Sequence, residues 1–279
     1  MSEKSPNTIN SPEIKQDGKR RKKAAFSDSI YPLTALGALL LIWELISVLE
    51  IVPNFMLPSP VQMLQAMYTD APVLARNAFT TLSEALIGLG IGVAIGYLTA
   101  VFMDSWDAAY KAIYPLIVVS QTIPTVAVAP LLVLWFGYDM KPKIILIILC
   151  TFFPIAVGVL DGFRAVDEDE VNLLRAMGAT KMQIFRHIKY PGALPQFFSG
   201  LRISVAYAIV GAVLAEWLGG FRGLGVYMIR VKKSFAYDRM FAVILLISVI
   251  SQFLLWVVNL IQKKCMPWEQ GFTDEREEV

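Results

Sequence analysis

Three glutamates lie inside or at the end of long apolar stretches of this 279-residue sequence, namely Glu44, Glu84 and Glu216. A carboxylate that faces lipid is strongly unfavourable, so each side chain should face protein, water or a basic partner. The structural interpretation is a protonated or hydrogen-bonded carboxyl group near the end of a helix. The functional interpretation is that some of them line a cavity for a polar solute, open toward the outer side of a membrane.

The usual catalytic and metal-binding patterns do not accompany these carboxylates. The only histidine is His187, and the two cysteines, Cys150 and Cys265, are not spaced like metal ligands. Neither an H-E-x-x-H pair nor a G-x-x-x-x-G-K-[S/T] phosphate-binding loop occurs in the chain. We therefore predict a non-catalytic protein with no metal site and no cofactor of its own, so that any ATP hydrolysis must belong to another polypeptide.

The composition requires a lipid environment. Hydrophobic residues make up 56% of the sequence and charged residues 17%, and the mean hydropathy is +0.56. Soluble proteins have roughly 45–50% apolar and about 25% charged residues. The net charge of +2 gives no support to nucleic acid as a partner. A helix needs about 20 apolar residues to cross a bilayer. Six stretches qualify, which predicts an all-α membrane protein with six transmembrane helices at 31–49, 77–103, 109–135, 142–160, 194–218 and 240–261.

Charge sets the expected orientation. With the N-terminus in the cytoplasm, sixteen Lys and Arg residues lie inside and eight outside, as the positive-inside rule requires. The third stretch contains Pro115, Pro124 and Pro130, which invite kinks, but splitting it in two would place the basic segment 161–193 outside. We expect a cytoplasmic tail at 1–29, disordered and basic, a membrane domain at 30–262 and a cytoplasmic C-terminal tail at 263–279. The basic loop before the last helix is an exception to the rule.

Two shorter patterns concern packing. Residues 61–68, after Leu57-Pro-Ser-Pro60, predict a short amphipathic helix at the membrane surface. Gly88, Gly92 and Gly96 recur every four residues and form a smooth stripe on a helix, where another backbone can approach closely. The stripe suits either a neighbouring helix of the same chain or a subunit interface. A second copy of the chain is expected, because one chain of six spans supplies only half of a symmetric pathway.

The cytoplasmic loop 161–193 is too patterned for a simple connector. Four acidic residues from Asp167 to Glu170 suit the start of a helix, and Gly178 can end that helix in a left-handed turn. Thr180 and Gln183 then fit a capping box that opens a second short helix, which Pro191 should close. The apolar residues at helical spacing are Val171, Leu174 and Met177 in the first helix and Met182, Phe185 and Ile188 in the second.

Such a hinged pair of amphipathic helices suits a cleft on a soluble partner and could pass movement to the membrane helices. A plain juxtamembrane hairpin and a DNA-binding helix-turn-helix are the alternatives, and the flanking membrane spans argue against the second. A stand-alone ion-driven secondary transporter would not need such a loop, and no internal repeat supports that class. An intramembrane enzyme would need a catalytic constellation that the sequence lacks.

The same loop resembles a known signature. Asn172-Leu-Leu-Arg-Ala-Met-Gly178, then nine residues, then Ile188-Lys-Tyr190-Pro191 is similar to the "EAA" motif of bacterial ATP-binding-cassette (ABC) importer permeases, although Asn172 stands where that motif has Glu. Further stretches, over residues 30–262, are similar to the nitrate, sulfonate, taurine and thiamine-precursor permeases: Leu57-Pro-Ser-Pro60, Gln121-Thr-Ile-Pro-Thr125, Ala129-Pro-Leu131, Leu134-Trp-Phe-Gly137, Ala215-Glu-Trp-Leu-Gly219 and Gly223-Leu-Gly225.

This resemblance implies a type I ABC importer permease in the bacterial inner membrane, with both termini cytoplasmic. The implied partners are two ATP-binding subunits that hold ATP and Mg, an external solute-binding protein and a second copy of the chain. The solute would be a thiamine-precursor pyrimidine, a sulfonate, nitrate or similar, and residues 143–155 are most similar to the pyrimidine branch. The residues expected to couple to the ATPase are Leu174, Ala176, Met177, Gly178, Ala179, Phe185, Ile188 and Pro191. Those expected along the solute pathway are Glu84, Gln121, Pro124 and Glu216, with Glu216 beside the outer gate.

Overall fold

The computed structural model describes residue 31 and residues 34–53 and 56–268, and every regular element among them is helical. The expected tail at 1–29 and residues 269–279 of the expected C-terminal tail lie outside the described residues. The chain forms two compact units, Met1–Leu64 and Gln65–Val279. Each unit has its own internal contacts.

In the first unit, an apolar helix, Thr34–Val48, is tied to the Leu57-Pro-Ser-Pro60 segment. The Trp43 indole donates a hydrogen bond to the Pro58 carbonyl, and the Ser47 hydroxyl donates one to the Leu57 carbonyl, each over 3.1 Å. Ser59 and Gln62 then form a reciprocal capping box, which opens α2 (Pro60–Thr69). The short helix predicted at 61–68 is therefore confirmed. Within the predicted span 31–49, the continuous helix among the described residues is Thr34–Val48, which alone is shorter than a bilayer requires, so this span stays a prediction.

Four long helical runs of the second unit correspond to predicted spans. They are α3 (Ala71–Ser105), α6 (Met140–Arg164), α9 (Tyr190–Gly219) with the turns before it, and α11 (Tyr237–Cys265). Each is long and apolar enough to cross a membrane. Their ends extend beyond the predicted limits because helices continue past the hydrocarbon region into polar residues.

The predicted third span is broken. Helices α4 (Asp107–Ser120) and α5 (Thr125–Phe136) meet at a bend of 95°, and neither is long enough to cross a bilayer alone. The break lies at Pro124, which precedes α5 in an extended conformation, whereas Pro115 and Pro130 lie inside the helices. Within the described residues, the pair makes a fifth span when counted as one, and the number six stays a prediction.

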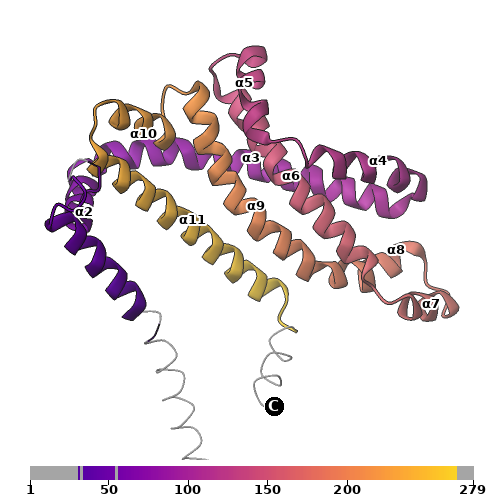
Figure 1. Cartoon of the computed structure of the whole chain (residues 1–279). Helices are drawn as coiled ribbons and strands as arrows, with labels where there is room; N and C mark the ends of the chain where they lie inside the picture. Colours follow the sequence, from indigo (N-terminus) through magenta and orange to yellow (C-terminus); the bar gives the residue numbers. More distant parts are fainter. Residues whose placement is uncertain (1–30, 32–33, 54–55, 269–279) are drawn as a thin grey trace, which may run out of the picture. The chain divides into compact units, whose positions relative to one another are not determined.

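The centre of the second unit is α6, which packs along both α3 and α9 (Figure 1). At Gly88 and Gly96 an added Cβ would lie 2.5 Å from Ile147 Cγ2 and 2.9 Å from the Phe152 carbonyl oxygen. On the other side of α6, the Pro154 carbonyl oxygen would lie 2.6 Å from a Cβ at residue 200. The glycine stripe of α3 therefore packs against a helix of its own chain, and its use as a subunit interface was a wrong alternative.

One helix was absent from the sequence prediction. The basic loop after α9 contains α10 (Leu224–Lys233), which lies at the opposite end of α9 from the loop 161–193 (Figure 1). Its buried residues are Leu224, Gly225, Tyr227 and Val231, and the three large ones have the i, i+3, i+7 spacing of one helix face. Basic side chains fill its last turn, where the helix dipole favours them.

Candidate functional site

The loop 161–193 folds as two short helices joined at a glycine. Asp167 accepts a hydrogen bond from the Asp169 amide over 2.9 Å and caps α7 (Glu168–Ala176). Gly178 has a φ of +83°, and its amide donates to the Arg175 carbonyl over 3.0 Å. The Ala179 amide donates to the Leu174 carbonyl over 3.0 Å, which completes a Schellman motif. The predicted left-handed end of the first helix is confirmed.

The second short helix begins as predicted and ends differently. Thr180 and Gln183 form the predicted capping box at the start of α8 (Lys181–Ile184). The chain then continues through a π-helical turn (Phe185–Lys189) directly into α9. Pro191 therefore does not close the helix, contrary to the prediction. The widened turn, in which the Tyr190 amide bonds to the Phe185 carbonyl, makes room for a residue that lacks its own amide hydrogen.

Three side-chain contacts fix the base of this loop. Lys189 Nζ lies 2.7 and 2.9 Å from the two carboxylate oxygens of Asp104, near the end of α3. The rings of Phe185 and Phe163 are 5.4 Å apart. At the end of α6, the Arg164 guanidinium carbon lies 3.3 Å from the centre of a tyrosine ring on α4. The loop is therefore joined to α3, α4 and α6 as well as to α9.

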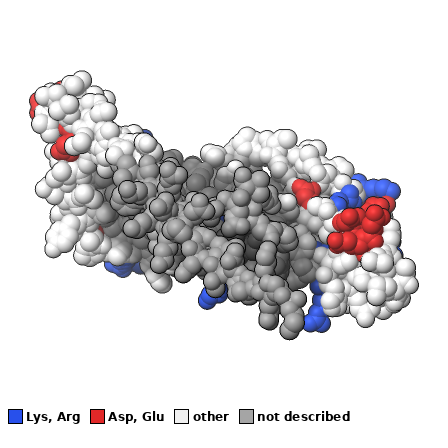
Figure 2. Space-filling view, turned by 90° about the horizontal axis from the view of Figure 1, so that it is seen from below, with Lys and Arg blue, Asp and Glu red and all other residues white. Residues whose placement is uncertain are grey.

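Three large apolar side chains of the loop face solvent. Leu173, Met177 and Met182 are 63%, 74% and 72% exposed, and we call them the docking surface. Acidic side chains gather in one patch where α7 lies, with basic side chains beside it (Figure 2). Of the eight predicted coupling residues, Ala176, Met177 and Gly178 are exposed, and Leu174, Ala179, Phe185, Ile188 and Pro191 are half-buried. Phe185 packs inward. The sequence analysis did not include Leu173 or Met182 among the residues expected to couple to the ATPase.

The predicted pathway residues separate into two groups. Gln121 and Pro124 line a cavity of about 420 Å³ at the bend between α4 and α5, which we call the pathway cavity. Phe153 from α6 and Tyr207 from α9 line it too, and none of its lining residues in the described part of the chain is charged. Glu84 and Glu216 are buried and do not line it.

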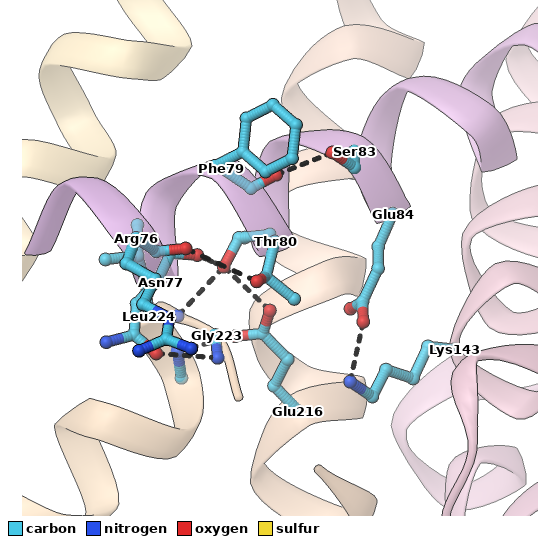
Figure 3. Close-up of polar contacts among 12 residues, drawn as sticks. Arg76, Asn77, Phe79, Thr80, Ser83, Glu84, Lys143, Glu216, Gly223 and Leu224 are labelled. Atoms are coloured by element: carbon cyan, nitrogen blue, oxygen red, sulfur yellow. Dashed lines mark hydrogen bonds and ion pairs between the residues drawn. The ribbon is translucent and has the colours of Figure 1, made fainter. Parts of the chain in front are cut away.

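Both glutamates have specific polar partners instead (Figure 3). Glu84 Oε1 accepts a hydrogen bond from Lys143 Nζ over 2.7 Å, and both side chains are buried. Glu216 Oε1 accepts a hydrogen bond from the Thr81 hydroxyl over 2.7 Å, and Oε2 accepts one from the Gly225 amide over 2.6 Å. This arrangement fits the structural interpretation of these carboxyl groups. Glu44, in the first unit, is half-buried.

The Gly-Leu-Gly motif at 223–225 lies against Glu216. Three successive amides at the start of α10 donate to Asn77 over 2.9 Å, to Thr81 over 2.9 Å and to Glu216. Gly223 has a φ of +126°, and a Cβ there would collide with the Glu216 carboxylate. Glycine is therefore required by both the backbone conformation and the close approach.

A second polar contact holds α10 from its outer side. The Tyr227 hydroxyl donates a hydrogen bond to Asp70 over 2.5 Å, and Arg239 Nε lies 3.2 Å from the same carboxylate. Burial, together with the adjacent Asp70 carboxylate, raises the pKa of the Tyr227 hydroxyl. The two contacts join the start of α3 to α10 and α11.

The sequence analysis also missed Lys143, which was counted as an outer-loop charge. Lys143 lies three residues inside α6 and is 5% exposed. A cation within one apolar run and a carboxylate within another is a signal for a buried ion pair. That signal could have paired Lys143 with Glu84 or Glu216, and only the fold selects between them.

A family model described as "Binding-protein-dependent transport system inner membrane component" matches residues 92–266. A probable ABC transporter permease protein of Haemophilus influenzae is 37% identical, over 79% of this chain and 90% of its own length. The formylaminopyrimidine transport permease protein of Halalkalibacterium halodurans is 36% identical, over 83% and 93%. The taurine transport permease of Escherichia coli is 28% identical, over 84% and 87%.

Solved structures agree on the fold. An inward-facing MetNI methionine ABC transporter matches with a TM-score of 0.60 and 20% identity, over 70% of this chain and 97% of that one. An amino acid ABC transporter crystallised with histidines matches with a TM-score of 0.58 and 18% identity, over 71% and 95%. The helical arrangement of this chain is therefore that of type I importer permeases.

Proposed function

Because the chain belongs to the family of binding-protein-dependent transport system inner membrane components, the transmembrane permeases of ABC importers, we propose that its docking surface binds a separate ATP-binding subunit. The chain is a multi-pass membrane protein and a non-catalytic subunit, and ATP hydrolysis takes place elsewhere in the importer. The exposure of Leu173, Met177 and Met182 carries the proposal, since apolar side chains on a cytoplasmic loop need a cover.

The attachments of the loop support a role in coupling. A force on the docking surface would reach α9 through continuous helix and α3 through the ion pair between Lys189 and Asp104. The inward-facing Phe185 would carry it to Phe163 on α6. The eight predicted coupling residues then divide into those that touch the ATPase, chiefly Met177 with Ala176 and Gly178, and those that hold the loop to the membrane helices.

The proposed assembly is two copies of the chain, two ATP-binding subunits that hold ATP and Mg, and an external solute-binding protein. Both termini would be cytoplasmic, which gives sixteen basic residues inside against seven outside once the buried Lys143 is left out. Helix α5 offers an apolar surface for the second copy, since Leu131, Leu134 and Trp135 are 46%, 78% and 68% exposed. Either lipid or a partner subunit has to cover them.

The pathway cavity favours an uncharged ring-shaped solute. Its polar groups include the Gln121 amide and the Tyr207 hydroxyl, and Phe153 offers an aromatic face. Nitrate, or the sulfonate group of taurine, would need a cationic residue or a helix N-terminus aimed at it. We therefore propose a small neutral heteroaromatic compound, such as the formylaminopyrimidine of the relative's name.

The docking proposal is tested by replacing one exposed methionine of the docking surface with a charged residue. Met177→Glu should release the co-expressed ATPase subunit during purification and abolish ATP-dependent uptake, because a carboxylate would enter an apolar contact. Met177→Leu should retain both the bound ATPase subunit and ATP-dependent uptake. Met56→Glu, at a methionine that is 57% exposed in the first unit, is the matched control. An intact complex with full uptake for Met177→Glu would refute the assignment.

The solute proposal needs the complete importer in proteoliposomes with its binding protein. Uptake of a labelled aminopyrimidine should fall about tenfold or more for Gln121→Ala, if the amide donates a single hydrogen bond worth about 1.5 kcal/mol. ATPase association should be unchanged in this variant. Uptake of taurine or nitrate with no uptake of the pyrimidine would overturn the solute class and leave the docking surface untouched.

A further inference from the structure

Three ionisable side chains from three helices meet in the interior of the second unit. Glu84 of α3, Lys143 of α6 and Glu216 of α9 are 2%, 5% and 1% exposed, and we call them the carboxyl cluster. Glu84 Oε1 lies 2.7 Å from Lys143 Nζ, and Figure 3 shows the Glu216 carboxyl group beside this pair. With all three ionised, the cluster would have a net charge of −1 in a buried site, which is strongly unfavourable.

The hydrogen bonds of Glu216 suit the ionised form. Both of its oxygens accept hydrogen bonds, from the Thr81 hydroxyl and from the Gly225 amide. The Gly225 amide belongs to the first turn of α10, where the helix dipole favours a negative charge. Glu216 therefore has two donors and a positive helix end, and Lys143 lies nearby as a counter-charge.

The hydrogen bonds of Glu84 leave one oxygen without a partner. Oε1 accepts from Lys143 Nζ, whereas Oε2 is buried and has no hydrogen-bond partner among the described residues. Figure 3 shows the Glu84 carboxyl group turned toward Lys143, with the Glu216 carboxyl group beside it and turned toward the start of α10. Two carboxyl groups can bond only when a proton lies between them, and that proton would also cancel the net charge.

We propose that the carboxyl cluster is a buried proton-binding site, in which Glu84 carries a proton on Oε2 and donates it to the Glu216 carboxylate. Lys143 then donates to Glu84, Glu84 to Glu216, and the cluster is neutral. The chain of hydrogen bonds ends at the Gly225 amide. These bonds therefore join the start of α10 to α3, α6 and α9. Loss of the proton would leave the buried cluster with a net charge of −1, next to the Glu216 carboxylate that holds the Gly225 amide.

The titratable groups that act on either carboxyl in the described part of the chain are the members of the cluster themselves. From α10 the contact comes from a backbone amide, and from α3 Thr81 adds a hydroxyl. The proton occupancy is therefore set by Lys143 and by the distance between the two carboxyl groups.

Infrared spectroscopy of the purified full-length chain at neutral pH tests the site. We expect a carbonyl stretching band of a protonated carboxylic acid that shifts on ¹³C-glutamate labelling and disappears in Glu84→Gln. Because the glutamine amide can donate to Glu216 and accept from Lys143, Glu84→Gln should melt within about 2 °C of the unmodified chain. Glu216→Gln places an amide against the Gly225 or Thr81 donors and should melt more than about 4 °C lower.

Two results would overturn the proposal. One is the absence of a glutamic acid band at neutral pH. The other is a band that persists in Glu84→Gln, which would place the proton on Glu216. Lys143→Met supplies a second check that does not depend on stability. It removes the counter-charge, so the acid band should grow rather than vanish, and an unchanged band would show that the lysine takes no part.

Discussion

Lys189 in the π-helical turn donates to both carboxylate oxygens of Asp104 near the end of α3, over 2.7 and 2.9 Å. The two side chains are 26% and 10% exposed, so the pair is screened less than a surface ion pair. It is a direct side-chain link between the loop 161–193 and a helix remote in sequence.

Asp104→Asn should destabilise the chain by about 1–2 kcal/mol, because the substitution leaves a partly buried lysine without its counter-charge. The exposed pair of Asp107 and Lys111 has the same 2.7 Å separation, so Asp107→Asn is a matched control that should have almost no effect. The measurement is the apparent melting temperature of each variant in detergent, alongside ATP-dependent uptake. Equal effects of the two variants would mean that the link from the loop to α3 is not structural.

Gly178→Val should leave membrane levels near normal and uncouple ATP hydrolysis from uptake. Residue 178 has a φ of +83° and open space around it, so the penalty of roughly 1–2 kcal/mol comes from the backbone alone. Gly178→Asn should be tolerated, since asparagine adopts this conformation more readily. Gly90→Val, with open space but an ordinary helical backbone, is the control. Uptake and co-purification of the ATPase are measured together, and full uptake by Gly178→Val would show that this turn transmits no force.

Gly92→Ala should destabilise the membrane domain by roughly 1–3 kcal/mol, because the new methyl group would collide with the buried Thr151 side chain. Thr151→Ala in the same chain should recover part of that loss, and Gly90→Ala should be neutral. Thermal unfolding in detergent gives the comparison. A stable Gly92→Ala variant without the second substitution would mean that α3 and α6 are packed less closely than the structure shows.

Thr180→Cys, in a chain without Cys150 and Cys265, should resist impermeant thiol reagents in intact cells, because the loop 161–193 is expected in the cytoplasm. Ser234→Cys follows α10 in the expected outer loop and is exposed, so it should react. Labelling in intact and permeabilised cells supplies the readout. Ready labelling of Thr180→Cys in intact cells would mean that the loop 161–193 lies outside and that the proposed orientation is wrong.

Local chemistry explains what could be predicted from the sequence. The long helices follow from hydrophobic runs of sufficient length, and the turn at Gly178 and the capping box at Thr180 depend on residues within one short segment. The π-helical turn could not be predicted in this way. Its residue Lys189 contacts Asp104, 85 residues away, and Pro191 alone suggested a helix end.

The same distinction holds for the buried polar residues. That Glu84 and Glu216 needed partners follows from their position in apolar runs, but the identity of each partner depends on which helices pack together. The packing brings Lys143 to Glu84 and the start of α10 to Glu216. Helix α10 was overlooked because its basic last turn was counted only as charge, and its apolar face is short.

The helical run Lys181–Gly219 is continuous over 39 residues and therefore about 58 Å long at about 1.5 Å per residue. Such a rod acts as a lever: a tilt of about 10° around its midpoint would carry each end sideways by about 5 Å, with no hinge between them. Met182 lies at one end and Glu216 at the other. If the ATP-binding subunit docks at Met182, a sideways push on that end would move the Glu216 end by the same distance in the opposite direction.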